Sequence, residues 1–226
     1  MKKLICILFG LVSMLNIQAK DAPTLEDVMR GKYRAEGVYG WNPSKDGESF
    51  TRTSADGKRI ARYSFRTGEE TETVFDVTTA RNVKLDRIDG YIMSPAEDNI
   101  LIQTETNSIY RHSFTAVYYI YNVKNRTLVP LSEGGPQQVP LFSPDGNLIA
   151  FVRDNNLFLV KLLYNNAESQ ITKDGKYNEV LNGIPDWVNE EEFSYARAFA
   201  FSADSKMLAW TRFDESRVPE FNFTMF

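Results

Sequence analysis

Histidine and cysteine, the side chains most often used in nucleophilic and transition-metal chemistry, are almost absent from this 226-residue chain. The chain has one histidine, His112, and one cysteine, Cys6. One imidazole cannot build a histidine-rich metal site, and one thiol cannot form a disulfide within the chain. A Ser-His-Asp triad would have to use His112, yet no Gly-x-Ser-x-Gly turn is present to carry the serine. We therefore predict no catalytic residue, no metal and no cofactor in these residues, and a structural role for His112.

Three consecutive carboxylates, Glu190, Glu191 and Glu192, form an acidic group a few residues after Asp186. Asp186 could cap a short helix that begins at Trp187, which would bring the glutamates close to the positive end of that helix. Successive residues of a helix point about 100° apart, so all three carboxylates cannot face one ligand. The residues alone favour a solvated acidic turn over a ligand site here.

The composition is that of a globular protein with a net negative charge. Hydrophobic residues make up 42% of the chain and aromatic residues 13%, which is enough to build a core. The formal charge of -4 at pH 7 argues against a nucleic-acid partner.

Residues 1–19 have the pattern of a secretory signal peptide. Lys2 and Lys3 precede a short apolar run over residues 4–15, and Ala19 precedes the predicted cleavage point. The run is too short for a membrane-spanning helix, so we expect no stable membrane span. This pattern predicts export to a bacterial periplasm or cell envelope; the alternative is an uncleaved N-terminal anchor.

Behind the signal peptide the sequence predicts one short helix and then mostly strands. Thr24 can cap a helix that ends at Gly31. Beyond it, short runs of Val, Ile, Thr, Tyr and Phe alternate with Gly, Asn, Asp and Pro turns, which is typical of β-hairpins. Examples are residues 47–53, 59–65, 117–123, 148–153 and 157–162.

A degenerate repeat organises these strands. Each copy has an apolar or aromatic residue, a turn similar to Ser-Pro-Asp-Gly, and an apolar strand. The copies are 93–102, 142–151 and 201–210, with a weaker one at 41–47. A spacing of about 50 residues, with four strands in each period, predicts an all-β β-propeller with at most four blades in this chain. The alternative is an irregular β-sandwich.

Three segments resemble one protein family. Residues 183–194, Gly-Ile-Pro-Asp-Trp-Val-Asn-Glu-Glu-Glu-Phe-Ser, resemble the double-glutamate motif of dipeptidyl peptidase IV. Residues 110–121 resemble the Arg-His-Ser segment of that family, and residues 213–221 continue the resemblance, which runs from about Thr24 to the last residue. The family belongs to the prolyl oligopeptidase clan of serine peptidases, which join an N-terminal β-propeller to a C-terminal α/β-hydrolase domain.

The resemblance implies a domain organisation. It implies a signal peptide at 1–19 and an incomplete β-propeller at 20–226, comprising about the first four of eight blades. The α/β-hydrolase domain and its catalytic triad would lie beyond Phe226, so we expect this fragment alone to be inactive. At full length, the resemblance implies a homodimer.

The resemblance also implies which residues bind substrate. Glu191 and Glu192 match the pair that binds the N-terminus of a peptide, Arg111 matches the arginine that holds a substrate carbonyl, and Glu190 serves the fold. A peptide ammonium has three N–H donors, and two carboxylates can accept from it and offset its charge. An amine anchored at a fixed distance from the serine would let the enzyme count two residues, and a pocket in the hydrolase domain would select Pro or Ala, so that X-Pro or X-Ala dipeptides are released. The alternative function is that of a non-catalytic periplasmic binding module.

Overall fold

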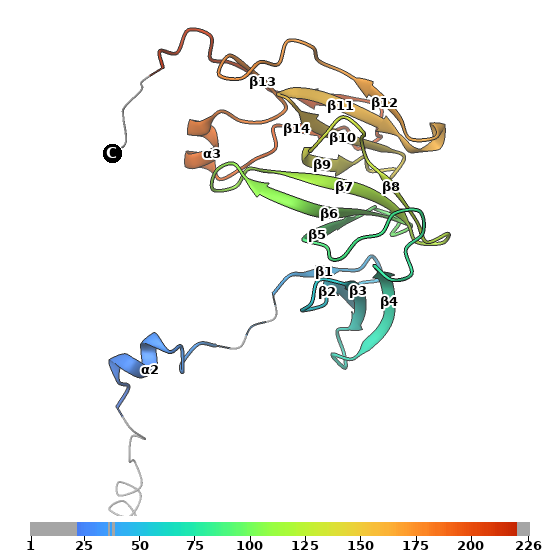
Figure 1. Cartoon of the computed structure of the whole chain (residues 1–226), viewed down its shortest axis with the longest axis vertical. Helices are drawn as coiled ribbons and strands as arrows, with labels where there is room; N and C mark the ends of the chain where they lie inside the picture. The colour runs from blue at the N-terminus through green and yellow to red at the C-terminus, as the bar shows by residue number, and fades with distance from the viewer. Residues whose placement is uncertain (1–21, 36, 38, 221–226) are drawn as a thin grey trace, which may run out of the picture. The chain divides into compact units, whose positions relative to one another are not determined.

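The computed structural model describes residues 22–35, 37 and 39–220 (Figure 1). The predicted signal peptide at 1–19 lies outside these residues. The chain divides into two compact units, Met1–Tyr39 and Gly40–Phe226. Within the described ranges, no helix is long and apolar enough to cross a membrane.

The described part of the first unit contains the predicted short helix, α2 (Leu25–Met29). The Thr24 side chain caps it by accepting a hydrogen bond from the main-chain N–H of Asp27 at 3.1 Å. The chain leaves the helix through Gly31, whose φ of 71° is in the left-handed region that glycine adopts easily. The predicted cap and stop are both confirmed.

The second unit consists mainly of antiparallel sheets (Figure 1), which confirms the all-β propeller class. Three sheets have four strands each, and every strand pairs with the next one along the chain. The first sheet contains β1 (Trp41–Pro43), β2 (Ser49–Thr53), β3 (Arg59–Ser64) and β4 (Glu70–Asp76). The second contains β5 (Gly90–Met93), β6 (Asn99–Ser108), β7 (Phe114–Asn122) and β8 (Thr127–Pro130). The third contains β9 (Gln138–Phe142), β10 (Leu148–Arg153), β11 (Asn156–Lys161) and β12 (Ala167–Gln170).

The remaining strands form two pairs. β13 (Val180–Asn182) pairs with β16 (Arg212–Asp214), and β14 (Phe199–Phe201) pairs with β15 (Leu208–Trp210). A 3-10 turn, η1 (Leu162–Tyr164), and a second α-helix, α3 (Trp187–Phe193), lie between strands. Helix α3 forms behind Asp186, at the position where the sequence analysis placed a possible cap.

The core lies between consecutive sheets. Along β10, Ile149 and Phe151 belong to a buried cluster shared with the second sheet, whereas Ala150 and Val152 belong to a cluster shared with β14. All four side chains are fully buried. An inner strand that is covered on both faces needs apolar residues at successive positions, which explains the continuous apolar runs after the repeated turns.

The repeat builds one type of turn. Two main-chain hydrogen bonds close the turn in each copy. The Ser N–H donates to the carbonyl oxygen of the residue five positions later, and the Ser carbonyl oxygen accepts from the N–H of the residue three positions later. That third residue has a positive φ in every copy, which glycine adopts most easily. Residues 40–220 contain five such turns, because Ser54-Ala55-Asp56-Gly57 forms another between β2 and β3. The positive-φ residues are Gly47, Gly57, Glu97, Gly146 and Ser205.

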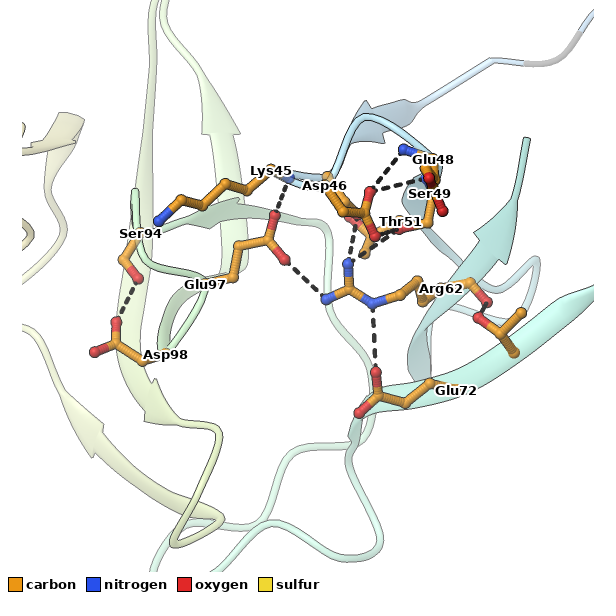
Figure 2. Close-up of polar contacts among 12 residues, drawn as sticks. Lys45, Asp46, Glu48, Ser49, Thr51, Arg62, Glu72, Ser94, Glu97 and Asp98 are labelled. Atoms are coloured by element: carbon orange, nitrogen blue, oxygen red, sulfur yellow. Dashed lines mark hydrogen bonds and ion pairs between the residues drawn. The ribbon is translucent and has the colours of Figure 1, made fainter. Parts of the chain in front are cut away.

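Two of these positive-φ residues are not glycine, and both contact the preceding sheet. Glu97 Oε1 accepts a hydrogen bond from the Lys45 N–H at 2.5 Å, and its Oε2 pairs with Arg62 Nη2 at 2.9 Å (Figure 2). Ser205 Oγ accepts from the Asp145 N–H at 3.0 Å. The turn thus connects the first sheet to the second, and the third to the pair β14–β15.

Candidate functional site

Arg111 lies on the loop that joins β6 to β7. The register of this long hairpin shifts between Thr104 and Asn107, and the tip closes with hydrogen bonds from the N–H groups of Ile109 and Tyr110 to the Ser113 carbonyl. The Arg111 side chain is 66% exposed. The hairpin therefore presents a guanidinium at its tip.

The three glutamates lie on α3. Asp186 caps this helix by accepting from the Asn189 N–H at 2.7 Å. Because the helix rotates successive side chains, the glutamates have three environments: Glu190 is 6% exposed, the Glu191 side chain 23%, and Glu192 is exposed. The predicted helix behind Asp186 is present, and it gives the three carboxylates different exposures.

Arg111 and Glu191 come together, although they are 80 residues apart in the sequence. Arg111 Nε lies 3.2 Å from Glu191 Oε2. The same oxygen accepts a hydrogen bond from the Tyr110 hydroxyl at 2.9 Å. Glu192, the third residue predicted for the site, makes no hydrogen bond or ion pair with the described part of the chain. The structure thus joins two of the three predicted residues.

Glu190 faces the hairpin instead. Its Oε1 accepts hydrogen bonds from the N–H groups of His112 and Ser113, both at 2.8 Å. This contact agrees with the expectation that Glu190 serves the fold. His112 contributes its main-chain N–H to the contact, as a structural residue would.

Sequence reasoning missed the aromatic residues at this site. The Tyr110 ring lies against Trp187, with centroids 6.0 Å apart, and the Arg111 guanidinium lies 5.9 Å from the Tyr110 ring centroid. Tyr110 precedes Arg111 in the motif-bearing segment, but nothing in the sequence indicates that its hydroxyl meets Glu191.

A cavity of about 430 Å³ adjoins the site. Its lining includes Tyr110, Trp187, Glu190 and Glu215. Burial, and then the charge of Asp186, raise the pKa of Glu215 above its ordinary value. The cavity thus has two carboxylates and aromatic rings in its lining, whereas Arg111, Glu191 and Glu192 lie outside that lining.

Packed antiparallel sheets with a repeated first turn define this chain as a β-propeller protein. Residues 94–226 match the family model described as the dipeptidyl peptidase IV (DPP IV) N-terminal region. The chain belongs to the dipeptidyl peptidase IV family and corresponds to its N-terminal region, which confirms the resemblance seen in the sequence.

Solved and curated relatives agree with this assignment. The crystal structure of Porphyromonas gingivalis dipeptidyl peptidase 4 matches with a TM-score of 0.83 and 39% identity, over 92% of this chain and 30% of that one. Probable dipeptidyl-aminopeptidase B of Chaetomium globosum is 43% identical over 140 residues, which are 59% of this chain and 15% of the relative. Human prolyl endopeptidase FAP is 31% identical over 201 residues, which are 88% of this chain and 25% of the relative. The chain thus spans a quarter or less of the length of these two curated relatives.

Proposed function

We propose that this chain is the substrate-gating and N-terminus-recognising part of an exported dipeptidyl peptidase IV-like serine exopeptidase that releases X-Pro or X-Ala dipeptides. In this proposal Glu191 and Glu192 bind the free amine of a peptide, and Arg111 holds a carbonyl of its first peptide unit. The serine, aspartate and histidine would come from an α/β-hydrolase domain beyond Phe226. Export rests on the signal pattern in residues 1–19.

The observation that carries the proposal is the contact between Arg111 and Glu191. Glu191 Oε2 is occupied by Arg111 and Tyr110, whereas Oε1 has no partner among the described residues. An ammonium could donate to that oxygen and to the neighbouring Glu192. Arg111 uses Nε for Glu191, so its two terminal nitrogens are available to a peptide carbonyl.

The arrangement would also fix how far the cleaved bond lies from the peptide N-terminus. A peptide held by its amine and its first carbonyl can extend in only one direction, so the bond that reaches a distant nucleophile is fixed by the distance from the amine. Binding energy at this site would therefore select the cleavage position, and a pocket in the hydrolase domain would select Pro or Ala. The names of two relatives, probable dipeptidyl-aminopeptidase B and dipeptidyl peptidase 4, support such a role.

The proposal can be tested by calorimetric titration of the full chain with the tripeptide Gly-Pro-Ala. Glu191→Gln and Arg111→Met should each weaken binding by about tenfold, because each removes one charged partner of the peptide. The matched control is Glu168→Gln. Glu168 is another carboxylate in an ion pair: its side chain is 29% exposed and pairs with Arg153 at 2.9 Å in the third sheet. Equal binding by all four proteins would refute the site.

A further inference from the structure

We propose that Glu190 and Tyr110 are positioning residues, which hold Arg111 and Glu191 in the arrangement that recognises a free peptide amine. This inference rests on the proposed function and adds two residues that would act through the binding residues rather than on the peptide. One carries a buried charge and the other a hydroxyl, and both connect the β6–β7 hairpin to α3.

Glu190 fixes the distance between the two elements. Its Oε1 receives the N–H groups of two consecutive hairpin residues, His112 and Ser113. The residue before His112 is Arg111, and the residue after Glu190 is Glu191. Arg111 and Glu191 are thus each the direct chain neighbour of a residue in this contact, so a shift of the hairpin against α3 would move Arg111 relative to Glu191.

Burial makes this contact specific. At 6% exposure, the Glu190 carboxylate has lost most of its water, and a buried charge is tolerated only where hydrogen bonds replace that water. Two converging N–H groups from adjacent residues form a concave donor site for one anionic oxygen. Another position of the hairpin would leave the carboxylate buried without these donors, so the observed position is strongly preferred.

Tyr110 fixes the orientation of the second carboxylate. Its hydroxyl and Arg111 Nε both contact Glu191 Oε2, at 2.9 Å and 3.2 Å. With two donors on one oxygen, the carboxylate cannot rotate freely, and Oε1 stays directed away from both of them. The Tyr110 ring packs against Trp187, the first residue of α3. The helix that carries Glu191 therefore also fixes the position of the Tyr110 hydroxyl.

The test measures amine discrimination, defined as the Kd of N-acetyl-Gly-Pro-Ala divided by the Kd of Gly-Pro-Ala for the full chain. Glu190→Ala should lower this ratio by about tenfold, and Tyr110→Phe by about fivefold, since each loses hydrogen bonds to a charged group. Glu190→Gln should keep most of the ratio, because its amide oxygen can still accept both N–H groups.

Matched controls separate positioning from general stability. Asp46 accepts the N–H groups of Glu48 and Ser49, each at 2.9 Å, in a turn of the first sheet. The Tyr91 hydroxyl donates to Thr51 Oγ1 at 2.8 Å. Asp46→Ala removes two hydrogen bonds from main-chain N–H groups to a carboxylate, and Tyr91→Phe removes a tyrosine hydroxyl bond, both far from the site in sequence. Each control should lower the melting temperature without changing the amine discrimination.

The outcomes distinguish this inference from the proposed function. A parent chain that binds both peptides equally refutes the proposed function, and the inference falls with it. If the parent chain discriminates and both Glu190→Ala and Tyr110→Phe melt cooperatively with an unchanged ratio, positioning is refuted while the proposed function stands. If Glu190→Ala does not fold, Tyr110→Phe decides: a lowered ratio supports the inference, and an unchanged ratio overturns it.

Discussion

Replacing Glu97 should loosen the connection between the first two sheets. Its carboxylate accepts the Lys45 N–H and pairs with Arg62, which also donates to Ser44 Oγ at 2.6 Å and pairs with Glu72 (Figure 2). Arg62 and Glu72 lie on β3 and β4 of the first sheet and Lys45 on the turn between β1 and β2, whereas Glu97 belongs to the turn before β6 (Figure 2). Glu97→Ala removes both bonds and leaves the rest of the Arg62 contacts in place.

The magnitude follows from the two bonds and their exposure. A hydrogen bond to a charged group contributes about 1.5–3 kcal/mol. The Arg62 and Glu97 side chains are 18% and 19% exposed, and Arg62 keeps Glu72 as a second partner. The loss should therefore be smaller than the summed contributions of the two Glu97 hydrogen bonds. We expect Glu97→Ala to lower the free energy of unfolding by about 2–3 kcal/mol.

The backbone provides an internal comparison. Glu97 has a φ of 60°, a left-handed conformation that costs about 1–2 kcal/mol for a residue with a Cβ atom. Glu97→Gly loses the same bonds but relieves this strain, so it should be more stable than Glu97→Ala by about 1 kcal/mol.

Urea unfolding of the full chain measures these differences, provided that the slope with denaturant is unchanged. Glu105 is the control: its φ is 52°, it is exposed, and its side chain makes no hydrogen bond with another described residue. Glu105→Ala should stay within about 0.5 kcal/mol of the parent. If Glu97→Ala also stays within that range, or if Glu97→Gly is less stable than Glu97→Ala, the reasoning is wrong.

Two further predictions concern the core and the pH dependence of stability. Phe151 is fully buried and stacks on Phe158 at 5.4 Å, so Phe151→Ala should lower the free energy of unfolding by about 3–5 kcal/mol in the same urea assay; a loss below about 1 kcal/mol would contradict the packing between sheets. The Ser143 hydroxyl, and then Asn147, lower the pKa of Asp145 to about 2. Since this folded pKa is below the unfolded value of about 3.9, ionised Asp145 stabilises the fold above pH 4, and the contribution is lost as the pH falls through about 2. The urea midpoint should therefore decrease more in the parent than in Asp145→Asn between pH 5 and pH 2, and parallel curves would refute the assignment.

The fold could be predicted largely from the sequence, because its signals are local. A Ser-Pro-Asp-Gly-like turn has a restricted backbone, and an inner strand covered on both faces is apolar at successive positions, as over residues 148–152 of β10. The turn at Ser54 was missed because it lies only 10 residues after Ser44 and does not fit the period of about 50. Helix α3 has only 7 residues, which is about two helical turns and too short to show a repeating apolar pattern, so only its cap at Asp186 indicated it.

The site could be predicted only in part. The residues alone favoured a solvated turn for the glutamates, and only the resemblance to a family selected Glu191 and Arg111. Their contact at 3.2 Å depends on the packing of the hairpin against α3, which no local pattern encodes. The Tyr110 hydroxyl could not be predicted for the same reason.

The central claim is that this chain binds the free amine of a peptide. The most direct test is calorimetric titration of the unmodified full chain with Gly-Pro-Ala and with its N-acetylated form, which has no ammonium group. We predict that the free peptide binds at least about tenfold more tightly, since acetylation removes the cation that the carboxylates would accept. Equal affinity for the two peptides would contradict the account.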